Sequence, residues 1–164
     1  MSERRIFLLR SLLTAGVAVG VFFLTLSAAR LLGQQGTDAA GSRFEAWDVW
    51  VDAADQTLAA YQFEFLDGSG RSTVVGVEGG EHAAFRDAPH YDSKALSKGR
   101  LIVAAFSTGE DLPRGKTRVA RLHLQIHGEG APPFDVKIMA SASFRGRKIP
   151  ATVTLKKVIL EKGK

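Results

Sequence analysis

The side chains best suited to bind a metal ion are histidines and aspartates gathered in one segment. That segment lies between the glycines at 79 and 99, and it contains His82, Asp87, His90 and Asp92. A mixed imidazole and carboxylate set can hold one ion if a loop brings the side chains together. A second pair, His123 and His127, lies four residues apart, and an extended strand would separate the two by about 13 Å on one face. That distance is too great for a single ion, so we expect surface histidines and predict no metal site.

Two further patterns only partly resemble functional motifs. Asp48, Asp52 and Asp55, with Gln56, have the composition of a calcium loop but lack its glycine and its closing glutamate. Residues 68–70 (Gly-Ser-Gly) surround a serine with glycines, but in a plain turn rather than in the sharp elbow of a nucleophile. The chain has no cysteine, which excludes thiolate zinc sites and cysteine nucleophiles. We therefore predict that the protein is not an enzyme and has no catalytic residues and no cofactor.

Four aromatic side chains are the candidates for contact with a partner. Trp47 and Trp50 are three residues apart, so one strand would place them on opposite faces. One of them must then face outward unless loops cover both, and an exposed tryptophan can anchor a protein partner or stack on a sugar. Phe85 and Tyr91 lie in the segment between the glycines at 79 and 99. They either hold that segment against the core or line a contact surface.

Apolar and polar residues alternate from Phe44 onward, and this pattern predicts strands. Tyr61, Phe63 and Phe65 alternate with polar neighbours, which indicates a half-buried strand with an aromatic inner face. Residues 122–126 repeat the pattern with aliphatic side chains. Residues 100–106 are almost continuously apolar, as expected for a strand covered on both faces. Further strands are predicted at 46–51, 73–78, 136–142 and 149–160.

Turn signals separate these strands, and no amphipathic helix follows the first thirty residues. Short strands at intervals of ten to fifteen residues favour an antiparallel sandwich or barrel. We therefore predict one all-β domain over residues 43–164, with no internal repeat. The segment between the glycines at 79 and 99 is the longest irregular one. A short helix is expected near residues 93–97.

The N-terminal residues predict export. Residues 1–10 form a basic cytoplasmic region, and residues 11–32 form a signal anchor or transmembrane helix whose uncharged core spans about 28 Å. Because three arginines precede the apolar run and one closely follows it, the N-terminus stays in the cytoplasm and the domain is extracytoplasmic. Residues 33–42 are small and polar and form a flexible linker. The alternative is a cleaved signal peptide, since small residues at 27–29 offer a cleavage site.

Charge is distributed unevenly along the chain. The 164 residues carry a formal net charge of +5, yet acidic side chains dominate residues 34–92 and basic ones dominate residues 93–164. Basic residues on a nucleic-acid surface would be clustered and interleaved with aromatics. Here they are scattered singly, so we predict no nucleic-acid partner. We expect the acidic and basic parts to pair with each other across the fold.

The order of the segments resembles that of cohesin modules. The similarity rests on the run 58–65 (LAAYQFEF), on 74–80 with its glycine turn, and on 99–107 with its apolar core. Residues 112–115 and 119–126 are similar to the turn and the strand that complete this block in cohesins. Most of residues 47–142 are covered. The chain departs from the pattern in a shortened N-terminal strand pair and in residues 66–69, which replace a Tyr-Asp-Pro-like turn.

This resemblance implies an antiparallel jelly-roll-like β-sandwich that binds rather than catalyses. Cohesins hold dockerin modules in polysaccharide-degrading assemblies, so a protein partner in the periplasm or at the cell surface is expected. The function predicted from the sequence is an exported, membrane-anchored module for protein–protein interaction. Two alternatives stay open: a carbohydrate-binding module on the same fold, with polysaccharide as its partner, and a structural subunit of an envelope or secretion assembly.

Overall fold

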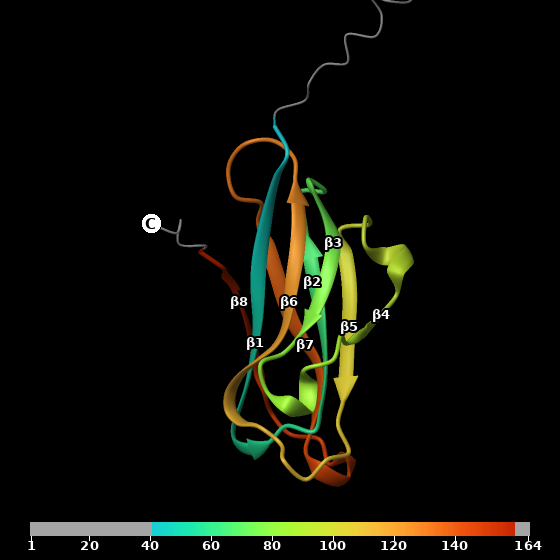
Figure 1. The fold of residues 1–164 in the computed structure, drawn as a ribbon, viewed down its shortest axis with the longest axis vertical. Helices are drawn as coiled ribbons and strands as arrows, with labels where there is room; N and C mark the ends of the chain where they lie inside the picture. The colour runs from blue at the N-terminus through green and yellow to red at the C-terminus, as the bar shows by residue number, and fades with distance from the viewer. Residues whose placement is uncertain (1–40, 160–164) are drawn as a thin grey trace, which may run out of the picture. The chain divides into compact units, whose positions relative to one another are not determined.

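The alternating segments form strands that pair into two antiparallel sheets in a computed structural model that describes residues 41–159 (Figure 1). The first sheet has the order β3-β6-β1-β8 and the second has the order β4-β5-β2-β7. The strands are β1 (Arg43–Thr57), β2 (Ala60–Asp67), β3 (Ser72–Gly79), β4 (His90–Tyr91), β5 (Arg100–Phe106), β6 (Arg114–Ile126), β7 (Phe134–Ala142) and β8 (Thr152–Lys157). Three short 3₁₀ helices connect them in the described part: η1 (Ala83–Phe85), η2 (Ser93–Ala95) and η3 (Phe144–Gly146).

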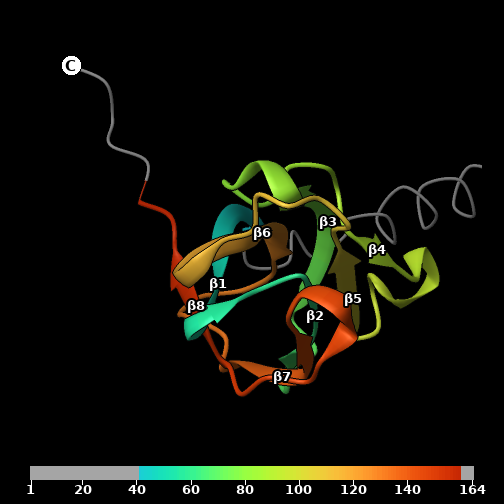
Figure 2. The same cartoon turned by 90° about the horizontal axis from the view of Figure 1, so that it is seen from below.

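The two sheets pack face to face and bury a continuous apolar core (Figure 2). Tyr61, Phe63 and Phe65 form the inner face of β2, as the alternation predicted. Leu122, Leu124 and Ile126 form the corresponding face of β6 and are fully buried. Each large side chain that is removed from water in this way contributes roughly 1.5–3 kcal/mol to folding. The expectation of an all-β sandwich is therefore confirmed.

The acidic and basic parts of the chain pair with each other, as expected. Each of the following ion pairs joins an acidic side chain before residue 93 to a basic one after it: Asp48–Arg121 at 2.7 Å, Glu64–Arg100 at 2.5 Å, Glu78–His123 at 2.7 Å and Glu45–Lys157 at 2.7 Å. Antiparallel pairing explains this, because it aligns segments that are far apart in sequence. Asp48, for example, lies opposite Arg121 in the register of β1 and β6.

The segment between the glycines at 79 and 99 is more ordered than the sequence suggested. It contains η1, the short edge strand β4 and η2, so the predicted helix near residues 93–97 is the single turn Ser93–Ala95. Gly79 and Gly80 let backbone segments approach closely at its start. A Cβ atom on Gly79 would overlap the Arg86 carbonyl, and one on Gly80 would overlap the Arg118 carbonyl. A side chain at either position would therefore force the backbone apart.

Element bounds differ from the prediction mainly at the two ends of the domain. The first strand extends from Arg43 to Thr57, and the last is one strand, Thr152–Lys157, within the predicted run 149–160. The predicted basic region 1–10, the signal anchor 11–32 and most of the linker 33–42 lie outside the described residues. Among residues 41–159, no helix has the length and apolar character needed to cross a membrane.

Candidate functional site

Within residues 41–159 the outer face of β5 is open, and this corrects the expectation that residues 100–106 are covered on both sides. Leu101 and Val103 point into the core, but Ile102 and Ala104 are only half-buried on the other face. Phe106 is 77% exposed at the end of the strand. The strand is almost continuously apolar because Leu101 and Val103 belong to the core, while Ile102, Ala104 and Phe106 form an apolar outer face. An exposed apolar strand face in a described domain of this size is a candidate contact surface.

Register places small side chains from three strands together beside Phe106. One row across the second sheet consists of Ala142, Ala60 and Phe106. The next row consists of Ala140, Gln62, Ala104 and His90. Alanine is depleted in strands, where larger branched or aromatic side chains stabilise the sheet better. Four alanines at this spot therefore form a low floor instead of a covering layer of side chains.

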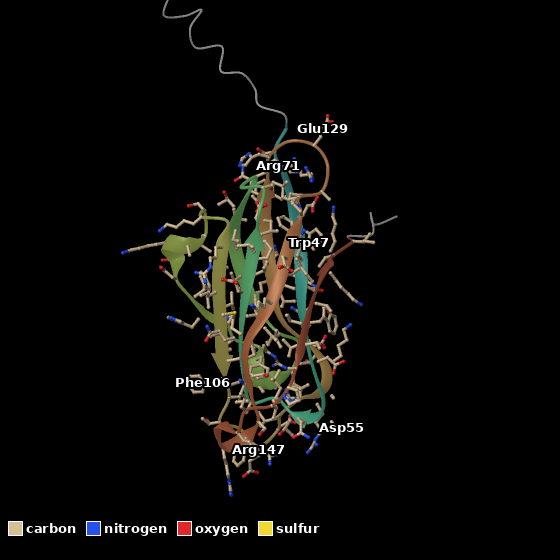
Figure 3. The ribbon with its side chains drawn as sticks, turned by 180° about the vertical axis from the view of Figure 1, so that it is seen from behind. Trp47, Asp55, Arg71, Phe106, Glu129 and Arg147 are labelled. Carbon is tan, nitrogen blue, oxygen red and sulfur yellow. The ribbon has the colours of Figure 1, made fainter. Side chains whose placement is uncertain are left out.

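A groove of about 580 Å³ lies over this floor. Phe106 and His90 flank it on the β5 side, and Gly146 and Lys148, which follow β7, line it on the other. A second hollow of about 480 Å³ adjoins it around the ends of β5 and β7 and is lined by Phe144 and Arg145 among others. Figure 3 shows Phe106 and Arg147 at this end of the domain, with Arg71 and Glu129 at the opposite end.

The turn at residues 143–148 forms one wall of these hollows and is held closed by hydrogen bonds. The Ser143 amide donates to the Arg147 carbonyl at 2.8 Å, and the Ser143 hydroxyl donates to the same oxygen at 3.2 Å. Arg145 has a φ of +66°, in the left-handed region that non-glycine residues rarely adopt. Its guanidinium lies 5.8 Å from the ring of Phe144, which is 48% exposed. The turn thus presents an aromatic ring and a cation at its tip.

The other half of the same sheet face is polar. The next row contains Lys137, Glu64 and Ile102, and the Glu64 carboxylate pairs with Arg100 at 2.5 Å. Exposed pairs of this kind add little stability, but they keep that half of the face solvated. This half of the face also carries Ile102 and the exposed Leu66, so it is the floor of small apolar side chains that is confined to the end of the sheet near Phe106.

The four aromatic residues proposed as partner contacts lie in different environments. Trp47 packs inward, with its ring 5.2 Å from Phe134 and its Nε1 donating to Glu45 at 3.0 Å. Phe85 is 3% exposed and meets the Tyr61 ring edge-on at 5.1 Å, so it anchors η1 to the core. Tyr91 is half-buried and packs against the same core.

Trp50 is the outward-facing tryptophan, on the first sheet rather than near the groove. Its ring lies between the ammonium groups of Lys116, at 5.9 Å, and Lys156, at 6.0 Å. The structure therefore places none of the four predicted contact residues in the groove. Whether Trp50 contacts a partner stays a prediction.

The histidines and aspartates singled out in the sequence are dispersed. His82 accepts a hydrogen bond from the Ala84 amide and lies 3.7 Å from Asp111. His123 contacts Glu78 on a neighbouring strand, and His127 contacts Ser42. Within residues 41–159, no group of three or more metal-binding side chains comes together. The prediction that the protein has no cofactor and no catalytic role stays a prediction.

Solved cohesin structures are similar to this domain in fold. One match, from the CaDoc0917–CaCohA2 complex at pH 5.5, has a TM-score of 0.51 and 10% sequence identity, and it covers 66% of this chain and 82% of the other. A second, from Coh-OlpA–Doc918, a type I cohesin–dockerin complex from Clostridium thermocellum, has a TM-score of 0.51 and 13% identity, with coverage of 68% and 84%. The fold is cohesin-like. No protein-family model and no curated protein sequence matches the chain.

Sequence reasoning missed the groove of this cohesin-like domain. Its floor consists of alanines, with Phe106 beside them, and these residue types usually indicate core. One signal was available: in 100–106, Phe106 shares its parity with Ala104 and not with the buried Leu101 and Val103. Ala60 and Ala142 lie too far apart in sequence for any local pattern to bring them together.

Proposed function

We propose that this chain is an exported, membrane-anchored and non-catalytic module that binds a partner protein through the groove of the second sheet. The observation that carries the proposal is the uncovered apolar end of that sheet. Alanines at 60, 104, 140 and 142 form its floor, and Phe106 stands beside them almost fully in water. A monomeric domain gains nothing from leaving a phenylalanine so exposed next to a floor of alanines.

The groove has the anatomy of a protein contact rather than of a reaction site. Apolar side chains at its centre would be desolvated by a partner, and polar and charged groups such as Gln62, His90 and Lys148 lie at its rim. A floor of small side chains lets a partner approach the sheet closely. Phe106 and Phe144 offer the large exposed side chains that typically provide most of the binding energy.

The cohesin-like fold supports the same role. The two solved structures described above come from complexes of a cohesin with a dockerin, which is a protein module. By analogy we propose a discrete protein domain as the partner of this chain. A carbohydrate would be expected to bind a planar row of exposed aromatic rings, whereas the groove presents alanines beside Phe106, and Phe144 lines the adjoining hollow.

Anchoring rests on the sequence of residues 11–32 and on the geometry of the domain. The described chain enters β1 beside the loop that joins β6 to β7 (Figure 1), where the Arg43 guanidinium donates to the Gly128 carbonyl at 2.6 Å. Phe106 and Arg147 lie at the opposite end of the domain from Glu129 (Figure 3). The first described residues of β1 therefore lie at the opposite end of the domain from Phe106.

Site-specific photocrosslinking in cells that express the full chain tests the binding proposal. A diazirine amino acid is placed at Ala104 or Ala140 in the groove, and at Thr154 on the outer face of the first sheet as a control. We expect one discrete protein adduct from both groove positions and none from Thr154. No adduct from either groove position would overturn the proposal, and binding of the purified chain to a glycan panel would then favour a carbohydrate-binding module.

Anchoring is tested separately by the mature N-terminus. Mass spectrometry of the chain from the membrane fraction is expected to find residues 1–32 still present. A mature chain that begins at Arg30 and leaves the membrane fraction would show that the apolar segment is a cleaved signal peptide. An adduct at Ala104 without a retained anchor would keep the binding role and remove only the tether.

A further inference from the structure

We propose that the partner docks through an acidic segment, in which apolar side chains enter the groove and carboxylates meet Lys148 and Arg145. This inference rests on the proposed function, since it specifies the chemistry of the partner for the same surface. It identifies the partner by its surface chemistry, which is a ridge of apolar side chains with aspartate or glutamate side chains beside it.

The first argument is the sign of the charges that line the two hollows. Lys148 lines the groove, and Arg145 lines the hollow that adjoins it. No aspartate or glutamate is among the described residues that line either one. The charged side chains that line the two hollows are therefore basic. A positive rim favours and orients an acidic partner and disfavours a basic one.

The second argument is that these cations are left unpaired. Arg145, Arg147 and Lys148 are all exposed, and within residues 41–159 none of them has a carboxylate within 4.0 Å. Elsewhere in the domain, cations such as Arg100, Arg121 and Lys157 pair with acidic side chains. Other cations of the described residues, such as Lys94 and Lys137, are also without an ion pair, but Arg145, Arg147 and Lys148 are neighbours on one turn, and two of them line the hollows, where a partner's carboxylates can reach them.

The third argument is that the turn holds these cations in place. Two hydrogen bonds from Ser143 to the Arg147 carbonyl and a bridge between Ala142 and Lys148 close the turn. Arg145 lies at the tip in the left-handed region, a conformation that costs energy for a residue with a Cβ atom. Preorganised cations lose less freedom on binding than mobile ones. Carboxylates beside an apolar ridge would therefore meet cations whose backbone is already ordered.

The experiment uses the full chain with the photocrosslinking amino acid at Ala104, and it measures the yield of the protein adduct. Charge reversal of both cations, Lys148→Glu with Arg145→Glu, is compared with a control pair, Lys98→Glu with Lys156→Glu. Lys98 precedes the start of β5 and Lys156 lies on β8 of the first sheet; both are exposed and neither lines a hollow. The two variants change the net charge equally. Thermal unfolding of each purified variant establishes that the domain is folded.

We expect the reversal of Lys148 and Arg145 to lower the adduct yield roughly tenfold, because attraction at two contacts becomes repulsion. The control pair should leave the yield close to that of the unchanged chain. Mass spectrometry of the partner peptide captured by the unchanged chain should find aspartate or glutamate close to the crosslinked residue. This second readout stands even if the reversed variant fails to fold.

Two results would overturn the inference while leaving the proposed function intact. One is a protein adduct at Ala104 whose yield falls no further with the reversed cations than with the control pair. The other is a captured peptide that carries basic residues and no carboxylates. If the unchanged chain forms no protein adduct at Ala104, the proposed function fails, and the acidic docking segment fails with it.

Discussion

The Tyr61 hydroxyl donates a hydrogen bond of 2.9 Å to the Val119 carbonyl and joins the two sheets through the core. Val119 is the extra residue of a bulge in β6, between the register pairs Val49–Ala120 and Trp50–Arg118. A bulge leaves its residue without a regular ladder partner, and a buried carbonyl without a partner is costly. Tyr61, on the second sheet, thus donates the hydrogen bond that the Val119 carbonyl does not receive within the first sheet.

Tyr61→Phe should destabilise the domain by about 1–2 kcal/mol, because it leaves the Val119 carbonyl without this donor in a buried site. Urea unfolding of the purified chain at neutral pH measures the change in the free energy of unfolding. Tyr91→Phe is the matched control, since Tyr91 is only half-buried and makes no hydrogen bond of this kind in the described structure. A loss of the same size in both variants would mean that the inter-sheet hydrogen bond contributes nothing specific.

The stability of the domain should fall in alkaline solution because of the Tyr61 side chain. Burial raises the pKa of Tyr61 well above its usual value of 10.0, so the folded state keeps the hydroxyl protonated while the unfolded state ionises. Its contribution is fully present below about pH 10 and is lost as pH rises further, by about 1.4 kcal/mol per pH unit. Tyr61→Phe should remove this slope between pH 10 and 11.5. An unchanged slope in the variant would assign alkaline unfolding to other groups.

Asp67 should make stability depend on pH in acid. It is 5% exposed, and its carboxylate accepts the Ser69 amide at 2.9 Å, the Ser72 amide at 2.7 Å and the hydroxyl groups of both serines. Burial alone would raise the pKa of Asp67, but these hydrogen bonds outweigh burial and lower it. Its contribution is therefore present above the unfolded-state pKa near 3.8 and is lost as pH falls through the lower folded value.

Asp67→Asn should cost about 1–3 kcal/mol at neutral pH, because an amide nitrogen cannot accept the hydrogen bonds that the carboxylate oxygen accepts. The variant should also lose stability less steeply than the unchanged chain below pH 4. Asp87→Asn, an exposed change in the loop that follows η1, is the control. Equal acid sensitivity of the Asp67 and Asp87 variants would contradict the role of Asp67.

Gly80→Ala should destabilise the domain by about 2 kcal/mol or more, because the new Cβ atom would overlap the Arg118 carbonyl of β6. Gly68→Ala is the control: its Cβ atom would meet no atom within 4 Å, so the change should stay within about 0.5 kcal/mol. Thermal unfolding of the two variants measures the contrast. Similar melting temperatures would show that β6 can move away from Gly80 at little cost.

Phe106→Ala should separate binding from folding. Because Phe106 is 77% exposed, its loss should change stability by no more than about 0.5 kcal/mol. The Ala104 adduct should nevertheless weaken markedly, since large aromatic anchors dominate interface energetics. Phe63→Ala, which removes a fully buried side chain from the neighbouring strand β2, should instead cost about 3–5 kcal/mol. An undiminished adduct would exclude Phe106 as an anchor.

The sequence by itself determined the local structure and the fold class. Alternation fixes which side chains share a strand face, and this indicated the aromatic inner face of β2 and the aliphatic face of β6 before any pairing was known. The sequence also indicated where two strands end. β3 ends at Gly79, at the pair of glycines 79 and 80, and β2 ends at Asp67, before a turn. The uneven charge along the chain also indicated pairing between its two parts, which the ion pair of Asp48 with Arg121 exemplifies.

Only the tertiary structure decided which faces are covered and which stay open. Periodicity placed Trp47 and Trp50 on opposite faces but could not say that Trp47 would pack inward against Phe134. It also could not say that no layer of the described residues covers the outer face of β5, or that Ala60 and Ala142 would lie side by side. The physical reason is that burial of a strand face depends on what packs against it, and the groove is assembled by long-range pairing between strands.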